Sequence, residues 1–452
     1  MISPLLAVVL PLAIAPLAYI VRRWAWAGGV LAALTASLAS RLFLSTPFDW
    51  SGQLFGRELA LEPASRAFLI FAFGLSAVMF LYAWQISPGW SFFPFTLTVL
   101  GFLSGALLLR NFSLSVLLAE LGFILMVFLV QSGRRGSVRA ALRYLTMVVL
   151  AGPPLLLVAQ LFPLRPARPD DEMLVQLCVA LLAFGGGILW GLVPFQGWLS
   201  ALGAEAPPLV SAFIGSAGQG AIFFLFLGTF KQHDWLLEGE LFYRILLWGG
   251  FLSACAGGFL ALFQRDFGRL LGYSLLGDMG CILMVWGTHP AGPVLAAFHF
   301  TGRSIAVVLL AMGLSAVRHH AGSDAFAELG GVARRLPFAT FALIGGGLSL
   351  SGFPLSAGFA SRWFLGQALS ERQFFASFIF LAGAGAVLSY LRGLAAMLAG
   401  QDGGAERRWK EPFVVKALIL IMALASLVLG LYPRLVLQVI GIMIEGYTFT
   451  LP

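Results

Sequence analysis

Long apolar runs recur from one end of the chain to the other, separated by short polar stretches. A helix needs roughly 20 apolar residues, at about 1.5 Å rise each, to cross the hydrocarbon core of a bilayer. Because the runs are continuously apolar instead of alternating, they predict spanning helices and not strands. About fourteen spans are predicted, near residues 2–20, 25–44, 65–84, 92–110, 113–132, 140–163, 173–199, 208–230, 242–264, 268–287, 291–317, 336–365, 373–399 and 411–441.

The composition agrees with this pattern. Of 452 residues, 60% are hydrophobic and 11% are charged, and the mean hydropathy is +0.92. These values lie far outside the range of soluble domains, so we predict an all-α, polytopic protein that lies within a lipid bilayer. The sequence has no dinucleotide fingerprint, P-loop or His/Cys cluster, and its three cysteines are isolated in apolar segments. We therefore expect no bound cofactor or metal, and no catalytic centre within the chain itself.

The basic residues are distributed unevenly among the short loops. The odd-numbered loops hold Arg22, Arg23, Arg134, Arg135, Arg139, Arg265, Arg269, Arg318, Arg334, Arg335, Arg407, Arg408 and Lys410. The even-numbered loops hold chiefly Arg57, Arg110, Arg165, Arg168, Lys231 and Arg372. The positive-inside rule then places the odd loops in the cytoplasm and both termini on the opposite side of a bacterial-type inner membrane. The net charge of +8 thus reflects topology, and we expect no nucleic-acid partner.

Two predicted spans carry helix-breaking sequence at comparable places. The seventh ends around Pro194 and the twelfth contains Pro354, 160 positions later. Interrupted segments that recur in each half are typical of transporters built from inverted repeats. An ordinary proline kink is the alternative. The repeat interpretation predicts N-terminal helices in residues 1–90, two inverted five-helix repeats in 91–230 (helices 4–8) and 231–400 (helices 9–13), and a last helix in 401–452.

Buried charges mark a candidate ion path. A charge at the bilayer centre costs at least about 2.5 to 3.5 kcal/mol, so acids and bases retained there usually line a hydrated route or pair with one another. The 160-residue offset maps Glu120 close to Asp278, which suggests one acid in each half. The further candidates are His299 and Arg303, which share one helix face, and Arg362.

Each candidate also has a purely structural interpretation. Glu120 would then form an ion pair, for example with Arg143 of the next span. Asp278 would be hydrogen-bonded to neighbouring backbone or serine, and His299 would be a satisfied core residue.

Several motifs give a more specific indication, because their order and spacing resemble those of the antiporter-like, proton-translocating membrane subunits of respiratory complex I. The similarity covers roughly residues 90 to 400. It rests on VPFQGWL (193–199), EAPPLVSAF (205–213), DFGRLLGYS (266–274), LGGVARRLP (329–337), the stretch 348–364 and YLR (390–392). The same fold occurs in Mrp-type antiporters, membrane-bound hydrogenases, formate hydrogenlyase and inorganic-carbon accumulation complexes. The resemblance implies a proton path through a glutamate of the fifth helix, which Glu120 matches, and through lysines or histidines of later helices.

The chain departs from that family pattern at the basic positions. Leu189 or a close neighbour replaces the lysine of the seventh helix, and Gln219 replaces that of the eighth. Arg303 and Arg362 stand where lysine is usual in the eleventh and twelfth, and Asp278 stands where many relatives have histidine. Lysine can lose its proton on burial, whereas arginine stays charged. We therefore predict a relay of Glu120, Asp278, His299 and water, biased by fixed arginine charges, with Gln219 ordering water.

Three functions remain open on the sequence alone. The first is a proton-conducting or proton-coupled subunit in a complex I-like or hydrogenase-like assembly. The second is the membrane subunit of an inorganic-carbon uptake complex energised by a cation gradient. The third is a non-conducting structural subunit of the same fold. The expected partners are other membrane subunits, the lipid bilayer, and a soluble arm that is either a redox assembly or a zinc enzyme.

Overall fold

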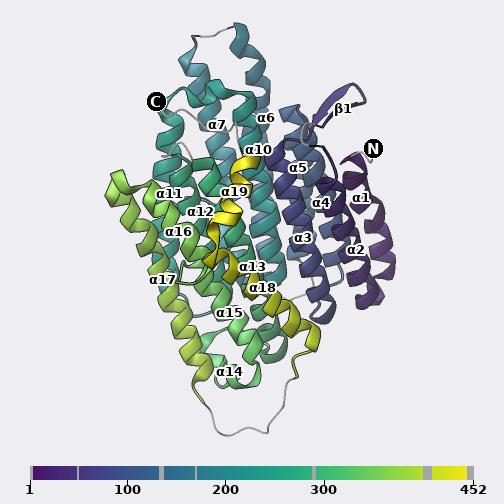
Figure 1. Cartoon of the computed structure of the whole chain (residues 1–452), viewed down its shortest axis with the longest axis vertical. Coiled ribbons are helices and arrows are strands. Elements are labelled where there is room, and N and C mark those ends of the chain that lie inside the picture. The colour runs from purple at the N-terminus through teal and green to yellow at the C-terminus, as the bar shows by residue number, and fades with distance from the viewer. Residues whose placement is uncertain are drawn as a thin grey trace.

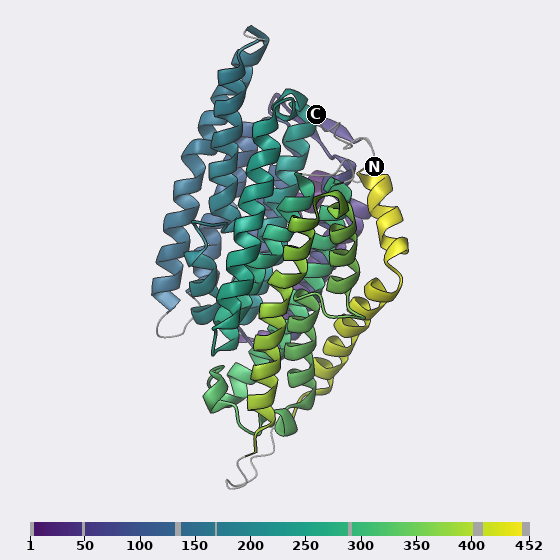
Figure 2. The same cartoon turned by 90° about the vertical axis from the view of Figure 1, so that its left-hand side faces the viewer.

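The computed structural model describes residues 4–47, 50–131, 137–167, 170–287, 292–400 and 410–444. Most helices run along the long axis of the molecule and form one bundle (Figures 1 and 2). The elements of the first half are α1 (Pro4–Ile20), α2 (Ala25–Leu44), β1 (Ser51–Leu54), β2 (Arg57–Ala60), α3 (Pro63–Gln85), α4 (Phe92–Leu108), α5 (Phe112–Val130), α6 (Ser137–Leu161), α7 (Glu172–Trp190), α8 (Gly197–Glu205), α9 (Pro208–Phe213), the π-helical turn η3 (Ile214–Gly218) and α10 (Gln219–Gln232). Those of the second half are α11 (Glu240–Leu262), α12 (Phe267–Trp286), α13 (Gly292–Ala321), α14 (Val332–Arg335), α15 (Pro337–Leu350), α16 (Ala357–Ala368), α17 (Gln373–Leu398), α18 (Phe413–Leu431) and α19 (Pro433–Met443).

The predicted polytopic, all-helical architecture is confirmed. In the described part of the chain, twelve helices are long and apolar enough to cross a bilayer. The 17-residue α4 and the interrupted pair α15 and α16 account for the two other predicted spans. Each of the fourteen predicted spans therefore has a counterpart in the structure.

The last predicted span, 411–441, is wrong in detail, because it divides into α18 and α19. Tyr432 leaves the helical conformation directly before Pro433, whose ring disfavours a helical residue in front of it. A hairpin of β1 and β2 is also present where only a loop was expected. Its two-residue turn has positive φ at both Phe55 and Gly56, the geometry that suits a tight hairpin.

Both predicted helix breaks are present. The first separates α7 from α8 and includes Pro194, and the second separates α15 from α16 and includes Pro354. Gly191 ends α7 with φ 67°, and Gly352 follows α15 with φ 80°, conformations that glycine adopts without steric cost. The helix ends at the second break lie inside the bundle, whereas the loop residues 353–355 are exposed at its surface.

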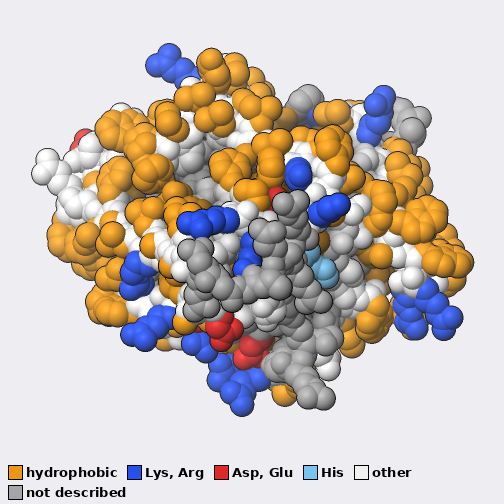
Figure 3. Space-filling model, turned by 90° about the horizontal axis from the view of Figure 1, so that it is seen from below, with side chains coloured by type: hydrophobic (Ala, Val, Ile, Leu, Met, Phe, Trp, Pro, Cys, Tyr) orange, Lys and Arg blue, Asp and Glu red, His pale blue; other side chains and the backbone are white. Residues whose placement is uncertain are grey.

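The loops rich in arginine lie at one end of the bundle, opposite the hairpin (Figure 1). Backbone pairing between Asp266 and Ala325 joins two of them, and Arg392 donates to the carbonyl of Gln264 in the same region. Seen from this end, Lys and Arg side chains lie at several places on the face and around its edge (Figure 3). Arg134, Arg135, Arg168, Arg407 and Arg408, which the topology prediction also uses, lie outside the described residues.

Gly358, in the first turn of α16, sets how closely the two halves of the broken helix approach. A Cβ atom there would overlap the Ser349 carbonyl oxygen, which is backbone and has little room to move. We predict that Gly358→Ala destabilises the protein by about 1–3 kcal/mol through forced displacement of the helix ends. Thermal aggregation of the purified protein, followed by size-exclusion chromatography after heating, measures this loss.

The matched control is Gly345→Ala in α15, where the nearest atom to an added Cβ is 4.0 Å away. This change should be neutral or slightly stabilising, since alanine favours helix over glycine. Equal heat resistance of the two variants would contradict the close approach at the break.

Candidate functional site

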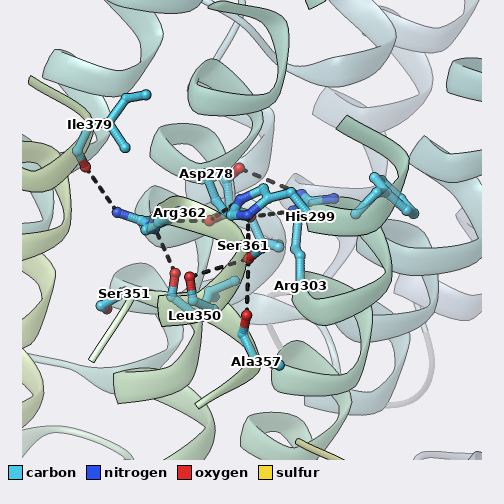
Figure 4. Close-up of polar contacts among 12 residues, drawn as sticks. Asp278, His299, Arg303, Leu350, Ser351, Ala357, Ser361, Arg362 and Ile379 are labelled. Atoms are coloured by element: carbon cyan, nitrogen blue, oxygen red, sulfur yellow. Dashed lines mark hydrogen bonds and ion pairs between the residues drawn. The ribbon is translucent and has the colours of Figure 1, made fainter. Parts of the chain in front are cut away.

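Three helices bring four of the predicted residues into one cluster. Asp278 lies on α12, and His299 and Arg303 lie one turn apart on α13. Arg362 lies on α16, the helix that directly follows the second break. All four side chains converge inside the bundle (Figure 4). Each residue is at most 4% exposed.

Asp278 is the acceptor at the centre of this cluster. Its Oδ1 lies 3.0 Å from His299 Nε2 and 3.0 Å from Arg362 Nη2, and its Oδ2 lies 3.2 Å from Arg303 Nε. The two contacts to Oδ1 are hydrogen bonds and the contact to Oδ2 is an ion pair. A buried carboxylate needs such charged or polar partners to offset the loss of water. Asp278 is therefore the negative charge that holds two buried guanidinium groups in place.

Arg303 extends the cluster into the first half of the chain. Its Nη1 donates to the Gly215 carbonyl at 2.8 Å, and its Nη2 donates to Gln219 Oε1 at 2.5 Å. Gly215 belongs to the π-helical turn η3, where the regular helical hydrogen-bond pattern is locally changed. Such turns are frequent at functional sites, and here the turn presents a carbonyl to the arginine.

Gln219 carries the connection to the first break. Its Nε2 donates to the carbonyl of Trp190 at 2.9 Å, and the Trp190 indole donates back to the Gln219 carbonyl at 3.3 Å. Trp190 is the last residue of α7, so its carbonyl has no partner within that helix. Trp198 Nε1 donates at 3.0 Å to the carbonyl of Ile188, which also accepts from the N–H of Gly191 at the helix cap.

Arg362 binds the end of the helix at the second break. Its Nη2 donates to the carbonyl of Leu350, the last residue of α15, at 3.0 Å, and its Nη1 donates to the carbonyl of Ile379 at 3.2 Å (Figure 4). A Cβ atom at Gly352 would overlap the Arg362 side chain, so the arginine lies directly across the break. A positive charge at the C-terminal end of a helix is also favourable for the helix dipole.

One buried polar chain therefore connects the two broken helices. It runs from the end of α7 through Gln219, Arg303, Asp278 and Arg362 to the end of α15. Two guanidinium groups face one carboxylate, so the cluster carries an excess positive charge while His299 is neutral. His299 is the member that can gain or lose a proton without leaving a buried guanidinium unpaired.

Sequence reasoning missed Ser361. Its Oγ lies 2.7 Å from His299 Nδ1, on the side of the ring away from Asp278. The only available signal was its place next to Arg362, one turn into the helix that follows the break. Among the described residues, no group of three or more His, Cys, Asp or Glu side chains is placed to hold a metal ion.

Glu120 and Arg143 lie apart from the cluster and from each other. Glu120 packs against Gly152 of α6. Arg143 lies on the same helix nine residues before Gly152, a separation of about 13 Å along the helix axis. Within the described ranges, Glu120 has neither a hydrogen bond nor an ion pair, and the ion pair with Arg143 suggested as its structural role is not formed. A cavity of only about 10 Å³ adjoins Glu120, with Leu189 in its wall. Leu189 thus occupies the place beside the acid where the family resemblance implies a lysine.

Comparison with known proteins identifies the fold and the family. The model of the family described as "NADH:quinone oxidoreductase/Mrp antiporter, TM" matches residues 155–389. A chain in the structure of the Mrp complex from Dietzia sp. DQ12-45-1b superposes with a TM-score of 0.87, at 20% identity over 98% of this chain and 52% of that one. A chain of respiratory complex I from Thermus thermophilus gives 0.83, at 19% identity over 99% of both.

Two curated relatives add sequence similarity. NADH-quinone oxidoreductase subunit N 2 of Acidobacterium capsulatum is 29% identical over 330 residues, which is 67% of this chain and 66% of the relative. Formate hydrogenlyase subunit 3 of Escherichia coli is 28% identical over 313 residues, 64% of this chain and 48% of the relative. The matched region thus spans about two thirds or less of these relatives. Because the family model covers more than half of the chain, including both breaks and the whole Asp278 cluster, the protein belongs to the NADH:quinone oxidoreductase/Mrp antiporter transmembrane family.

Proposed function

We propose that this protein is a membrane subunit of a multi-subunit ion-translocating complex, and that it conducts or couples protons through the Asp278 cluster. The observation that carries the proposal is the buried polar chain that joins the broken helices α7 and α15. Irregular backbone at membrane depth is tolerated where it is buried in protein or lines a water-filled path. Here the carbonyl groups of Trp190 and Leu350 accept from Gln219 and Arg362, which belong to the same polar chain as Asp278, the partner of His299.

The chemistry of the cluster favours protons over a metal cation. Arg303 and Arg362 keep their charge, so they set the electrostatic field without exchanging protons. The excess positive charge repels a bare cation, whereas an imidazole such as that of His299 can accept and release a proton. Glu120 is the second exchangeable group of the proposed path, in the first of the two proposed repeats (91–230 and 231–400).

The proposed assembly follows from the relatives. Two of them are named as subunits of NADH-quinone oxidoreductase and of formate hydrogenlyase, and the superposed chains come from an Mrp complex and from respiratory complex I. We propose that this chain likewise sits among other membrane subunits in a bacterial inner membrane, next to a soluble arm. The arginine-rich end would face the cytoplasm.

A non-conducting structural role is the second candidate, and the surroundings of Glu120 favour it. The cavity beside Glu120 has room for about one water at most, and Leu189 offers no charge or hydrogen bond. Gln219, which connects the halves, is neutral and cannot carry a proton.

Removing the central acid tests the proton path. We predict that Asp278→Asn lowers proton-coupled activity by roughly 100-fold, because the buried arginines lose their counter-charge and His299 loses its ionised partner. The intact complex is reconstituted in vesicles, and proton movement is followed with a pH-sensitive dye.

Glu120→Gln, which keeps the shape of the side chain, should also reduce coupling. Assembly of each variant is checked by the subunit content of the purified complex. Wild-type coupling in an assembled Glu120→Gln, Asp278→Asn double variant would exclude the relay and favour the structural role.

The charge of Arg362 can be separated from its geometry. Arg362→Lys keeps a positive charge beside Asp278, whereas Arg362→Gln removes it. We predict that the lysine variant retains much of the activity and the glutamine variant loses it, because lysine keeps a positive charge beside Asp278 although it loses the directed contacts of the guanidinium. The same dye assay compares the lysine and glutamine variants. Equal activities would show that a positive charge at this position is not required for proton coupling.

The proposed orientation is tested with a membrane-impermeant maleimide. In a variant with Cys178, Cys255 and Cys281 replaced by alanine, Phe55→Cys at the tip of the hairpin should label in intact cells. Ala327→Cys, exposed at the arginine-rich end, should label only after permeabilisation. The reverse pattern would invert the topology.

A further inference from the structure

The hydroxyl of Ser361 lies between the His299 ring and the first turn of α16. Its Oγ is 2.7 Å from His299 Nδ1, 3.0 Å from the Ala357 carbonyl oxygen and 3.2 Å from that of Gly358. Ser361 is fully buried, so water does not compete for these partners. We propose that this hydroxyl is a hydrogen-bond switch that passes the charge state of His299 to the broken helix, an inference that rests on the proposed proton coupling.

The neutral state of His299 has one consistent arrangement of hydrogens. Asp278 is an ionised acceptor held by two arginines, so His299 Nε2 must carry the hydrogen that points to it at 3.0 Å. The other ring nitrogen, Nδ1, is then an acceptor. Ser361 has a single hydroxyl hydrogen, and in this state it donates that hydrogen to Nδ1.

Protonation of His299 reverses the direction of this bond. The added proton resides on Nδ1, because Nε2 already carries one, and the ring then donates at both nitrogens. Ser361 becomes the acceptor, and its own hydrogen turns to the Ala357 carbonyl. One proton is gained by His299 and none leaves Ser361, so the hydroxyl changes partners without changing its own protonation.

The new bond acts on the helix that carries Arg362. A serine that donates to the carbonyl four residues earlier slightly destabilises and often bends its helix. Ala357 is the first residue of α16, directly after the break, where few neighbouring turns resist such a bend. The charge of His299 is thereby converted into a shift of the helix end next to Arg362, and Ser361 is a positioning residue for that step.

Two isosteric replacements separate the hydroxyl from packing. Ser361→Thr and Ser361→Val place nearly the same volume at this site, but only threonine keeps a hydroxyl. We expect the threonine variant to retain at least ten times the proton-coupled activity of the valine variant in the vesicle assay. The matched control is Ser304→Ala, since Ser304 is equally buried but, among the described residues, its hydroxyl bonds only to the Phe300 carbonyl of its own helix. This control should behave as wild type.

A spectroscopic measurement tests the switch without activity. The chain has five histidines, and replacing the other four by glutamine leaves His299 as the single signal in a complex in which only this chain is labelled with ¹⁵N-histidine. In the neutral ring, the ¹⁵N chemical shift of Nδ1 should be that of an unprotonated nitrogen that accepts a hydrogen bond. Ser361→Val should move this shift towards the value of an unprotonated nitrogen without a hydrogen bond, whereas Ser361→Thr should not.

The outcomes distinguish the switch from the proposed function. If Asp278→Asn abolishes coupling while the threonine and valine variants have equal activity and equal Nδ1 resonances, the switch is wrong and proton coupling stands. If the resonances differ as expected but no variant changes proton movement, the hydrogen bond is present, the proposed function fails, and the switch fails with it.

Discussion

The ends of two helices stop inside a membrane-spanning bundle, and their free carbonyl groups must find donors where there is no bulk water. This requirement organises the centre of the protein. Backbone N–H groups of each break supply some of them, and the side-chain donors are Gln219 and Trp198 at the first break and Arg362 at the second. Because Gln219 and Arg362 are both tied to the Asp278 cluster, one polar network links the two helix ends.

The charge pattern of this network differs from what a chain of lysines would provide. A lysine can give up its proton when buried, whereas a guanidinium stays charged and holds several acceptors in fixed directions. Arg303 and Arg362 together engage the carboxylate, Gln219 and the carbonyls of both halves. The centre is therefore a rigid electrostatic frame, in which the imidazole of His299 and the hydroxyl of Ser361 are the groups that can rearrange their hydrogens.

Much of this arrangement could be predicted from the sequence, for identifiable reasons. Pro194 and Pro354 interrupt otherwise continuous apolar runs, and buried charges such as Asp278 and Arg303 are rare enough to stand out. The pairing of Gln219 with Trp190 could not be predicted, because it depends on how α10 packs against the end of α7. Ser361 was missed because serine is common in membrane helices, and only the distance to His299 distinguishes it.

The two halves also differ in a way that no periodicity reveals. The second half surrounds its acid with three basic side chains, whereas the first half places Glu120 between a glycine and apolar residues such as Leu189. A carboxylic acid in such surroundings is stabilised by being neutral or by a donor from outside the described residues. The carboxylate of Asp278 needs no such help, since two guanidinium groups compensate its negative charge within the bundle. In the proton path that we propose, the partly buried Glu120 thus lies among apolar groups, whereas the fully buried His299 is held by hydrogen bonds that the chain itself supplies.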